Sequence, residues 1–171
     1  MRVTYNRELK VKSVLDELHI ENFLPMHYEK VTSVGSPQRE LVPAVHNLIF
    51  VRNSMEILSN LKATVGGLAP LKFMTRPQAH GSDHNEVIFV PDHEMENFMC
   101  VASVIDDGVR FLEMSDYIDM VGRNVRITDG VFKGVEGVIK RIKKNKLVVV
   151  RIQGVAAVAI TTVSPDLITE I

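Results

Sequence analysis

The chain contains 171 residues, of which 46% are hydrophobic and 24% are charged, a balance typical of a folded globular protein and not of a disordered one. It is long enough for one ordinary domain or two small ones, and it contains no run of ~20 apolar residues of the kind that spans a membrane. The N-terminal residues lack the apolar core of a signal peptide, and the single cysteine, Cys100, has no partner for an intramolecular disulfide. We therefore expect a cytoplasmic protein.

The net charge of −1 conceals an uneven distribution of charged residues. Residues 122–171 contain nine Lys or Arg and four Asp or Glu, whereas the rest of the chain contains 11 basic and 17 acidic residues. A basic C-terminal part joined to an acidic N-terminal part predicts separate partners for the two parts. The alternative is an uneven division of solvated surface charge that serves no partner.

Helical and extended patterns alternate in the first third of the chain. Residues 8–19 predict a helix, because apolar side chains recur near a 3.6-residue spacing at Leu9, Val11, Val14, Leu15 and Leu18. Residues 22–25 end this helix and begin an extended segment. The polar residues 28–41 contain the turn signal Gly35-Ser36-Pro37 and predict the tip of a hairpin. The apolar residues 48–51 predict a short strand.

A second and a third helix are expected further along the chain. Residues 54–62 have helical spacing with Ser54 as the N-cap, and Gly66-Gly67 ends this segment. Strands are expected at 72–74 and 87–90, with a loop over 78–85. The third helix is expected at 93–102 with Asp92 as its N-cap. The acidic and less regular residues 103–120 contain the candidate linker.

Residues 130–138, which read Gly-Val-Phe-Lys-Gly-Val-Glu-Gly-Val, are the most informative stretch of the chain. Glycines among β-branched residues predict a tight, bent β structure, because glycine allows positive φ and close backbone approach. Residues 122–171 are rich in Val, Ile and Thr, and turn signals at 143–146 and 153–154 separate the apolar runs. We expect five short strands that close into a small barrel.

The 130–138 segment resembles the KOW motif of NusG-type transcription factors, whose core elements correspond here to Gly130, Phe132, Gly134 and Gly137. The order of elements along the whole chain also resembles NusG and its operon-specific paralogues. Within that group the sequence is most similar to UpxY-type regulators of capsular polysaccharide loci, and the similar strings lie at residues 5–12, 20–26, 46–51 and 90–92. It departs from the family at residues 45–48, which read Val-His-Asn-Leu, and in the N-terminal Trp-Tyr strand, near whose end Met1 aligns.

The resemblance implies an α+β protein with three parts. Residues 1–115 would form an NGN-like antiparallel sheet flanked by helices, residues 116–121 a linker, and residues 122–171 an SH3-like KOW β-barrel. It further implies a monomeric, non-enzymatic elongation and antitermination factor without cofactors or metals. The expected partner is RNA polymerase, at the clamp helices of its largest subunit; further partners would be non-template DNA, nascent RNA, the ribosome or a small inhibitory protein.

The resemblance also suggests candidate binding residues. The polymerase-binding candidates are Val45, His46, Leu48, Phe50 and Phe73. Val45 and Leu48 are expected to be exposed, whereas Phe50 and Phe73 could instead fill the core. Tyr5, Arg7 and Lys10 could hold single-stranded DNA, since positive charge beside a stacking ring suits that ligand, or they could form a solvated helix end. The nucleic-acid candidates of the barrel are Lys140, Arg141, Lys143 and Lys144, for which a solvated hairpin turn is the alternative.

Other classes of function have weaker support in the sequence. His80, Asp83, His84 and His93 lie close together in sequence, but they lack the phased spacing of a metal-binding helix. No G-x-S-x-G nucleophile motif is present. The alternative to a transcription factor is a KOW-containing RNA- or ribosome-binding protein linked to translation. Such proteins are normally strongly basic, which the net charge of −1 does not favour.

Overall fold

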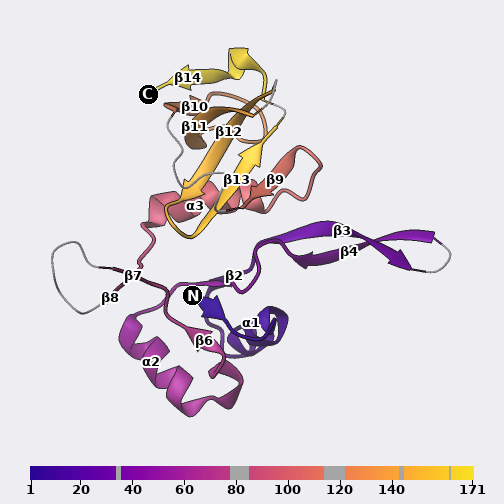
Figure 1. The fold of residues 1–171 in the computed structure, drawn as a ribbon. Coiled ribbons are helices and arrows are strands. Elements are labelled where there is room, and N and C mark those ends of the chain that lie inside the picture. Colours follow the sequence, from indigo (N-terminus) through magenta and orange to yellow (C-terminus); the bar gives the residue numbers. More distant parts are fainter. Residues whose placement is uncertain (34–35, 78–84, 114–121, 143–144, 162) are drawn as a thin grey trace. The chain divides into compact units, whose positions relative to one another are not determined.

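A computed structural model describes residues 1–33, 36–77, 85–113, 122–142, 145–161 and 163–171 (Figure 1). The fold is mixed α and β, and the chain divides into two compact units, Met1–Phe89 and Val90–Ile171. This division differs from the expected one, which placed the boundary at residues 116–121. Those linker residues lie outside the described part of the chain. None of the helices in the described ranges is long and apolar enough to cross a membrane.

Unit 1 combines two helices with short antiparallel strand pairs. Its elements in chain order are β1 (Arg2–Val3), α1 (Glu8–Glu17), β2 (Asn22–Phe23), β3 (Met26–Ser33), β4 (Ser36–Pro43), β5 (Phe50–Val51), α2 (Met55–Thr64), the 3-10 helix η1 (Gly66–Leu68), β6 (Leu71–Lys72), β7 (Thr75–Pro77) and β8 (Asn85–Val87). The pairs are β1–β6, β2–β5, β3–β4 and β7–β8.

The core of unit 1 lies where α1 packs on the strand pairs. Val11 and Leu15, four residues apart and therefore on one helix face, are fully buried with Val3, Ile49 and Leu71. The predicted helix is confirmed, although its apolar face is narrower than expected. Leu9 and Leu18, which the spacing assigned to that face, are 55% and 39% exposed.

Local signals placed two further elements of unit 1 correctly. Ser54 caps α2 as predicted, because its hydroxyl accepts a hydrogen bond from the Ile57 amide at 3.2 Å. The predicted hairpin is also confirmed: β3 and β4 pair from Met26↔Pro43 to Ser33↔Ser36. Figure 1 shows this ribbon extending away from α1 and α2 within unit 1.

Unit 2 contains one helix and a six-stranded antiparallel sheet. Its elements are α3 (Asp92–Ala102), β9 (Val109–Leu112), β10 (Arg123–Ile127), β11 (Glu136–Ile142), β12 (Asn145–Ile152), β13 (Ala156–Ile160), the 3-10 helix η2 (Pro165–Leu167) and β14 (Ile168–Glu170). The strand order is β14-β10-β11-β12-β13-β9. The five strands after residue 122 agree with the expectation from the sequence.

Two features of unit 2 correct the sequence analysis. β9 comes from the segment expected to contain the linker, and it pairs with β13 from Ala157↔Leu112 to Ile160↔Val109. Asp92 is not the N-cap of α3, because Pro91 occupies the cap position and Asp92 is the first helical residue. The α3 helix packs against β12 and β13, and all five residues of β13 are buried. α3 and β9 therefore belong to the same compact unit as the C-terminal strands.

Candidate polymerase and nucleic-acid interfaces

The segment between β10 and β11 forms two successive tight turns. The Lys133 amide donates to the Gly130 carbonyl at 3.1 Å, and the Val135 amide donates to the Phe132 carbonyl at 3.1 Å. Gly130 and Gly134 have φ values of +84° and +87°, a region that side chains other than glycine rarely adopt. The Gly134 amide also donates to the Ile127 carbonyl at 2.8 Å, which ties the turn to the end of β10. Gly130 and Gly134 therefore have the conformational role that the sequence predicted for glycine.

Gly137 is required for a different reason. It lies in β11 opposite Val125, and its φ is not positive. A Cβ atom built on Gly137 would lie 2.7 Å from the Val149 carbonyl oxygen and 3.0 Å from Val148 Cγ1. The close approach of β12 therefore excludes a side chain at this position.

Phe132 is half-buried in the turn and lines a cavity of about 290 Å³ within unit 2. Val163 and Leu167, from the C-terminal end of the chain, also line this cavity. Its acidic lining residues are Asp106 and Asp129. The aromatic ring of the motif is thus partly accessible and not part of a closed core.

The polymerase-binding candidates of unit 1 differ in exposure. His46 is exposed, and Val45 and Phe73 are half-buried. Leu48 is only 3% exposed, so the expectation that it is a surface residue is wrong, and Phe50 is 7% exposed. Leu48 forms a bridge with Arg2, which explains its fixed position beside β1.

Leu48 and Phe50 nevertheless lie apart from the core beneath α1. Ile49 belongs to that core, and side chains alternate between the two faces of an extended segment. Leu48 and Phe50 therefore point to the face opposite α1. On this face the rings of Phe23 and Phe50, which are directly paired across β2 and β5, have centroids 6.5 Å apart.

Tyr5 and Arg7 lie against each other just before α1, and Lys10 follows in the first turn of the helix. Tyr5 is 83% exposed, and the Arg7 guanidinium carbon lies 5.7 Å from the centroid of its ring. Tyr5 and Asn6 have φ values of +65° and +50°, an unusual backbone conformation for an aromatic residue. Arg7 and Lys10 are exposed at the first turn of the helix. The result is an exposed ring flanked by positive charge.

A buried carboxylate connects this turn to the polymerase-binding candidates. Glu8 is 3% exposed, and its Oε1 accepts a hydrogen bond from the Asn47 amide at 2.6 Å. The Asn47 carbonyl accepts from the Val3 amide at 2.9 Å, and Asn47 has a φ of +60°. Tyr5–Arg7 and Val45–His46 are therefore neighbouring surfaces joined through Glu8. The sequence analysis missed Glu8, although an acidic residue beside the apolar positions of the first helical turn is a possible signal for such a bond.

The barrel cations are described only in part. Lys140 is half-buried in β11 and pairs with Leu147, and Arg141 pairs with Lys146. Lys143 and Lys144 lie outside the described residues. The same holds for His80, Asp83 and His84, so the loop of potential metal ligands is not described. Among the residues that are described, no group of three His, Cys, Asp or Glu side chains could hold a metal ion.

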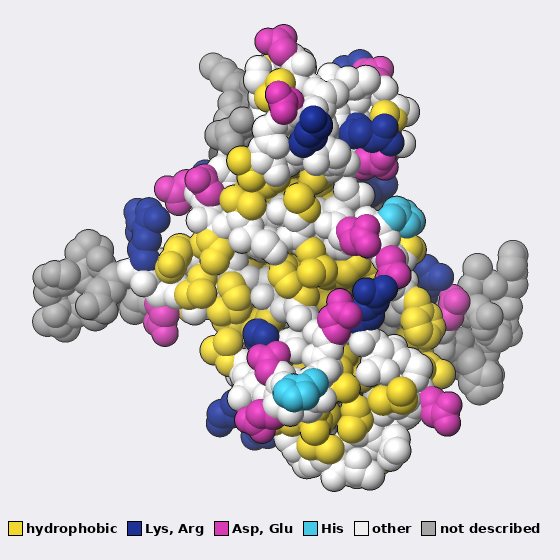
Figure 2. All heavy atoms as spheres, turned by 180° about the vertical axis from the view of Figure 1, so that it is seen from behind, with side chains coloured by type: hydrophobic (Ala, Val, Ile, Leu, Met, Phe, Trp, Pro, Cys, Tyr) yellow, Lys and Arg dark blue, Asp and Glu magenta, His cyan; other side chains and the backbone are white. Residues whose placement is uncertain are grey.

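Exposed apolar side chains occur elsewhere on unit 1 as well. Met55 and Ile57 of α2 are 48% and 49% exposed, and hydrophobic side chains are visible at the surface in Figure 2. These residues provide controls for the candidate surface, because exposure alone does not distinguish a binding residue. None of the known protein-family models or curated proteins matches this sequence.

Proposed function

We propose that this protein is a non-enzymatic transcription elongation and antitermination factor, similar to NusG, that binds RNA polymerase and promotes read-through of long operons. Capsular polysaccharide loci are the expected targets. The observation that carries the proposal is that three glycines of the KOW-like string lie where another residue would be strained or would clash. Gly130 and Gly134 have positive φ, and Gly137 lies against the backbone of β12. A glycine string without structural meaning would not need glycine at each of these positions.

The surface of unit 1 supports a polymerase contact beside a DNA contact. His46 is exposed and Val45 half-buried, and Glu8 joins their loop to the turn that carries Tyr5 and Arg7. A ring flanked by cations suits the bases and phosphates of a single strand. Partly exposed apolar and imidazole groups suit a protein contact. A factor that binds polymerase next to an exposed DNA strand requires these two surfaces side by side.

Purified RNA polymerase provides the direct test. We expect the wild-type protein to bind core polymerase without DNA and to increase read-through at a terminator on a long template. Val45→Asp should weaken that binding by at least roughly 10-fold, because a carboxylate placed in an apolar contact loses its hydration. Ile57→Asp introduces the same charge at an exposed apolar residue of α2 and should bind as wild type does.

A parallel measurement with purified ribosomes tests the translation alternative. Binding to ribosomes and not to polymerase would replace our proposal by a ribosome-binding function. Equal loss of polymerase affinity in Val45→Asp and Ile57→Asp, with both proteins folded, would remove the assigned surface.

A further inference from the structure

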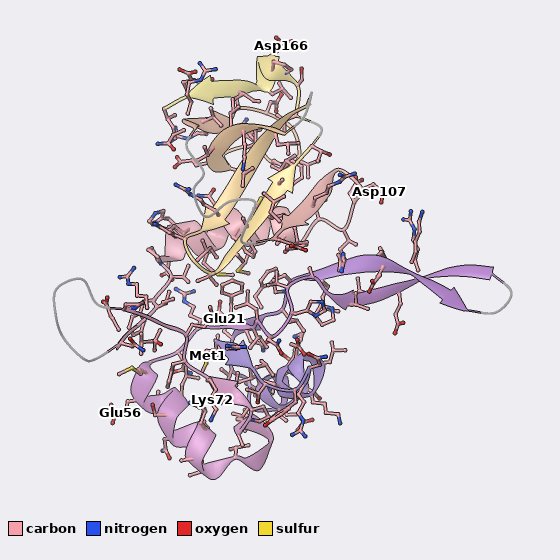
Figure 3. The ribbon with its side chains drawn as sticks, viewed as in Figure 1. Met1, Glu21, Glu56, Lys72, Asp107 and Asp166 are labelled. Carbon is pink, nitrogen blue, oxygen red and sulfur yellow. The ribbon has the colours of Figure 1, made fainter. Side chains whose placement is uncertain are left out.

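Three cations from separate elements meet on unit 1. Arg2 in β1 and Lys72 in β6 are directly opposite each other in the antiparallel pair, so their side chains lie on the same face. Lys62 of α2 places its Nζ 4.4 Å from the centroid of the Phe73 ring, next in sequence to Lys72. Figure 3 labels Lys72, together with Met1, which precedes β1.

The positive charges of this cluster repel each other. Directly opposed like charges destabilise a strand pair, and Arg2 and Lys72 are such a pair. The pKa of Lys62 is lowered by the partial burial of its ammonium group and, to a lesser extent, by the charge of Lys72. Arg2 and Lys72 are exposed, so both can reach a ligand in solvent.

No acidic side chain in the described ranges compensates for these charges. Ion pairs of unit 1 in those ranges include Lys12–Asp16, Arg52–Glu21 and Arg76–Glu86. Arg2, Lys62 and Lys72 take part in none of them. Within the described part of unit 1, the cluster therefore combines electrostatic repulsion with a lack of acidic partners, as expected of a site whose counterion is an external ligand.

The chemistry of the cluster favours phosphate over a protein partner. The central part of a protein–protein interface is usually apolar or aromatic. Here the ring of Phe73 already has Lys62 over it, and Leu48, which is bridged to Arg2, is only 3% exposed. Contact with a nucleic-acid backbone needs positive charge and no apolar centre.

We propose that Arg2, Lys62 and Lys72 form a second nucleic-acid contact, which binds the phosphodiester backbone without reading its sequence. It is separate from the Tyr5–Arg7 turn, which offers a ring for stacking. The proposal does not depend on polymerase binding, because it concerns the protein and nucleic acid alone.

Fluorescence anisotropy of the full chain with a labelled 20-nucleotide dT strand and a 20-base-pair duplex tests the site. The test variant is Arg2→Gln, Lys62→Gln, Lys72→Gln. The matched control is Lys12→Gln, Arg52→Gln, Arg76→Gln, which removes the same charge from ion-paired positions of unit 1. In the test variant, the slope of log K against log salt should fall by roughly 2 for the single strand and by roughly 3 for the duplex. The control should retain nearly the wild-type slope.

Thermal unfolding separates ligand binding from a structural role. Removing mutual repulsion should leave the test variant at least as stable as wild type, despite its weaker binding. Equal loss of affinity in the test and control variants would overturn the site, because it would reflect net charge alone. Wild-type binding by the test variant would also overturn the site. So would a result in which poly-L-glutamate competes as well as unlabelled dT does at the same total charge.

Discussion

The distinct roles of Gly134 and Gly137 predict different responses to the same substitutions. Gly134 has a φ of +87° and no atom within 4 Å of a built Cβ, so Gly134→Ala costs only backbone strain of about 1–2 kcal/mol. Gly137→Ala places Cβ 2.7 Å from the Val149 carbonyl oxygen, whereas even close carbon–oxygen contacts between strands are about 3.3 Å. The two strands must then separate, at a cost of about 1–3 kcal/mol from overpacking.

Asparagine distinguishes strain from collision, because it tolerates positive φ better than alanine does. Gly134→Asn should therefore recover part of the stability that Gly134→Ala loses. Gly137→Asn should be at least as destabilising as Gly137→Ala, since any Cβ meets the backbone of β12. The four variants thus form a matched set with one predicted rescue.

Hydrogen exchange of the full chain, read by mass spectrometry, measures these effects locally. Amides of β11 and β12 should lose less protection in Gly134→Asn than in Gly134→Ala, and at least as much in Gly137→Asn as in Gly137→Ala. Amides of α1 lie in the other unit and serve as an internal control. Rescue by asparagine at Gly137, or its failure at Gly134, would show that the assigned roles of the two glycines are wrong.

Three further outcomes are expected. In the double variant Arg7→Ala, Lys10→Ala, the slope of log K against log salt for single-stranded DNA should fall by roughly 1.4. Polymerase binding without DNA should not change. An unchanged slope would favour a solvated helix end. Glu8→Ala should destabilise unit 1 by about 1–3 kcal/mol in urea unfolding, because the Asn47 amide loses its acceptor. Glu8→Gln, which keeps an acceptor oxygen, should cost less. Equal costs would contradict the role of Glu8 as the acceptor of this hydrogen bond. Burial lowers the pKa of the Met1 amine from 8.0 to about 6, so the unfolded state binds its proton first as the pH falls. The free energy of unfolding of unit 1 should therefore fall by about 2 kcal/mol between pH 8 and pH 6. Nα-acetylation should abolish this part of the pH dependence. The same fall in the acetylated protein would assign it to other titrating groups.

The sequence by itself determined the features that depend on nearby residues. The spacing of Val11 and Leu15 placed α1, because residues four apart lie on one helix face. Ser54 identified the start of α2, since its hydroxyl reaches an amide only three residues away. Gly130 and Gly134 predicted the bent turn between β10 and β11, where backbone conformation alone requires glycine.

Only the tertiary structure decided the features that depend on distant residues. Leu48 is buried and bridged to Arg2. β9 pairs with β13, so it belongs to unit 2, and unit 1 ends at Phe89 instead of at the expected residue 115. The partner of Glu8 could not be recognised from the sequence, because Asn47 is 39 residues away. Local sequence patterns encode the buried face of a helix, its caps and the turns. Burial and the clustering of charges depend on which strands pair. A window of neighbouring residues does not contain the identity of the pairing strand.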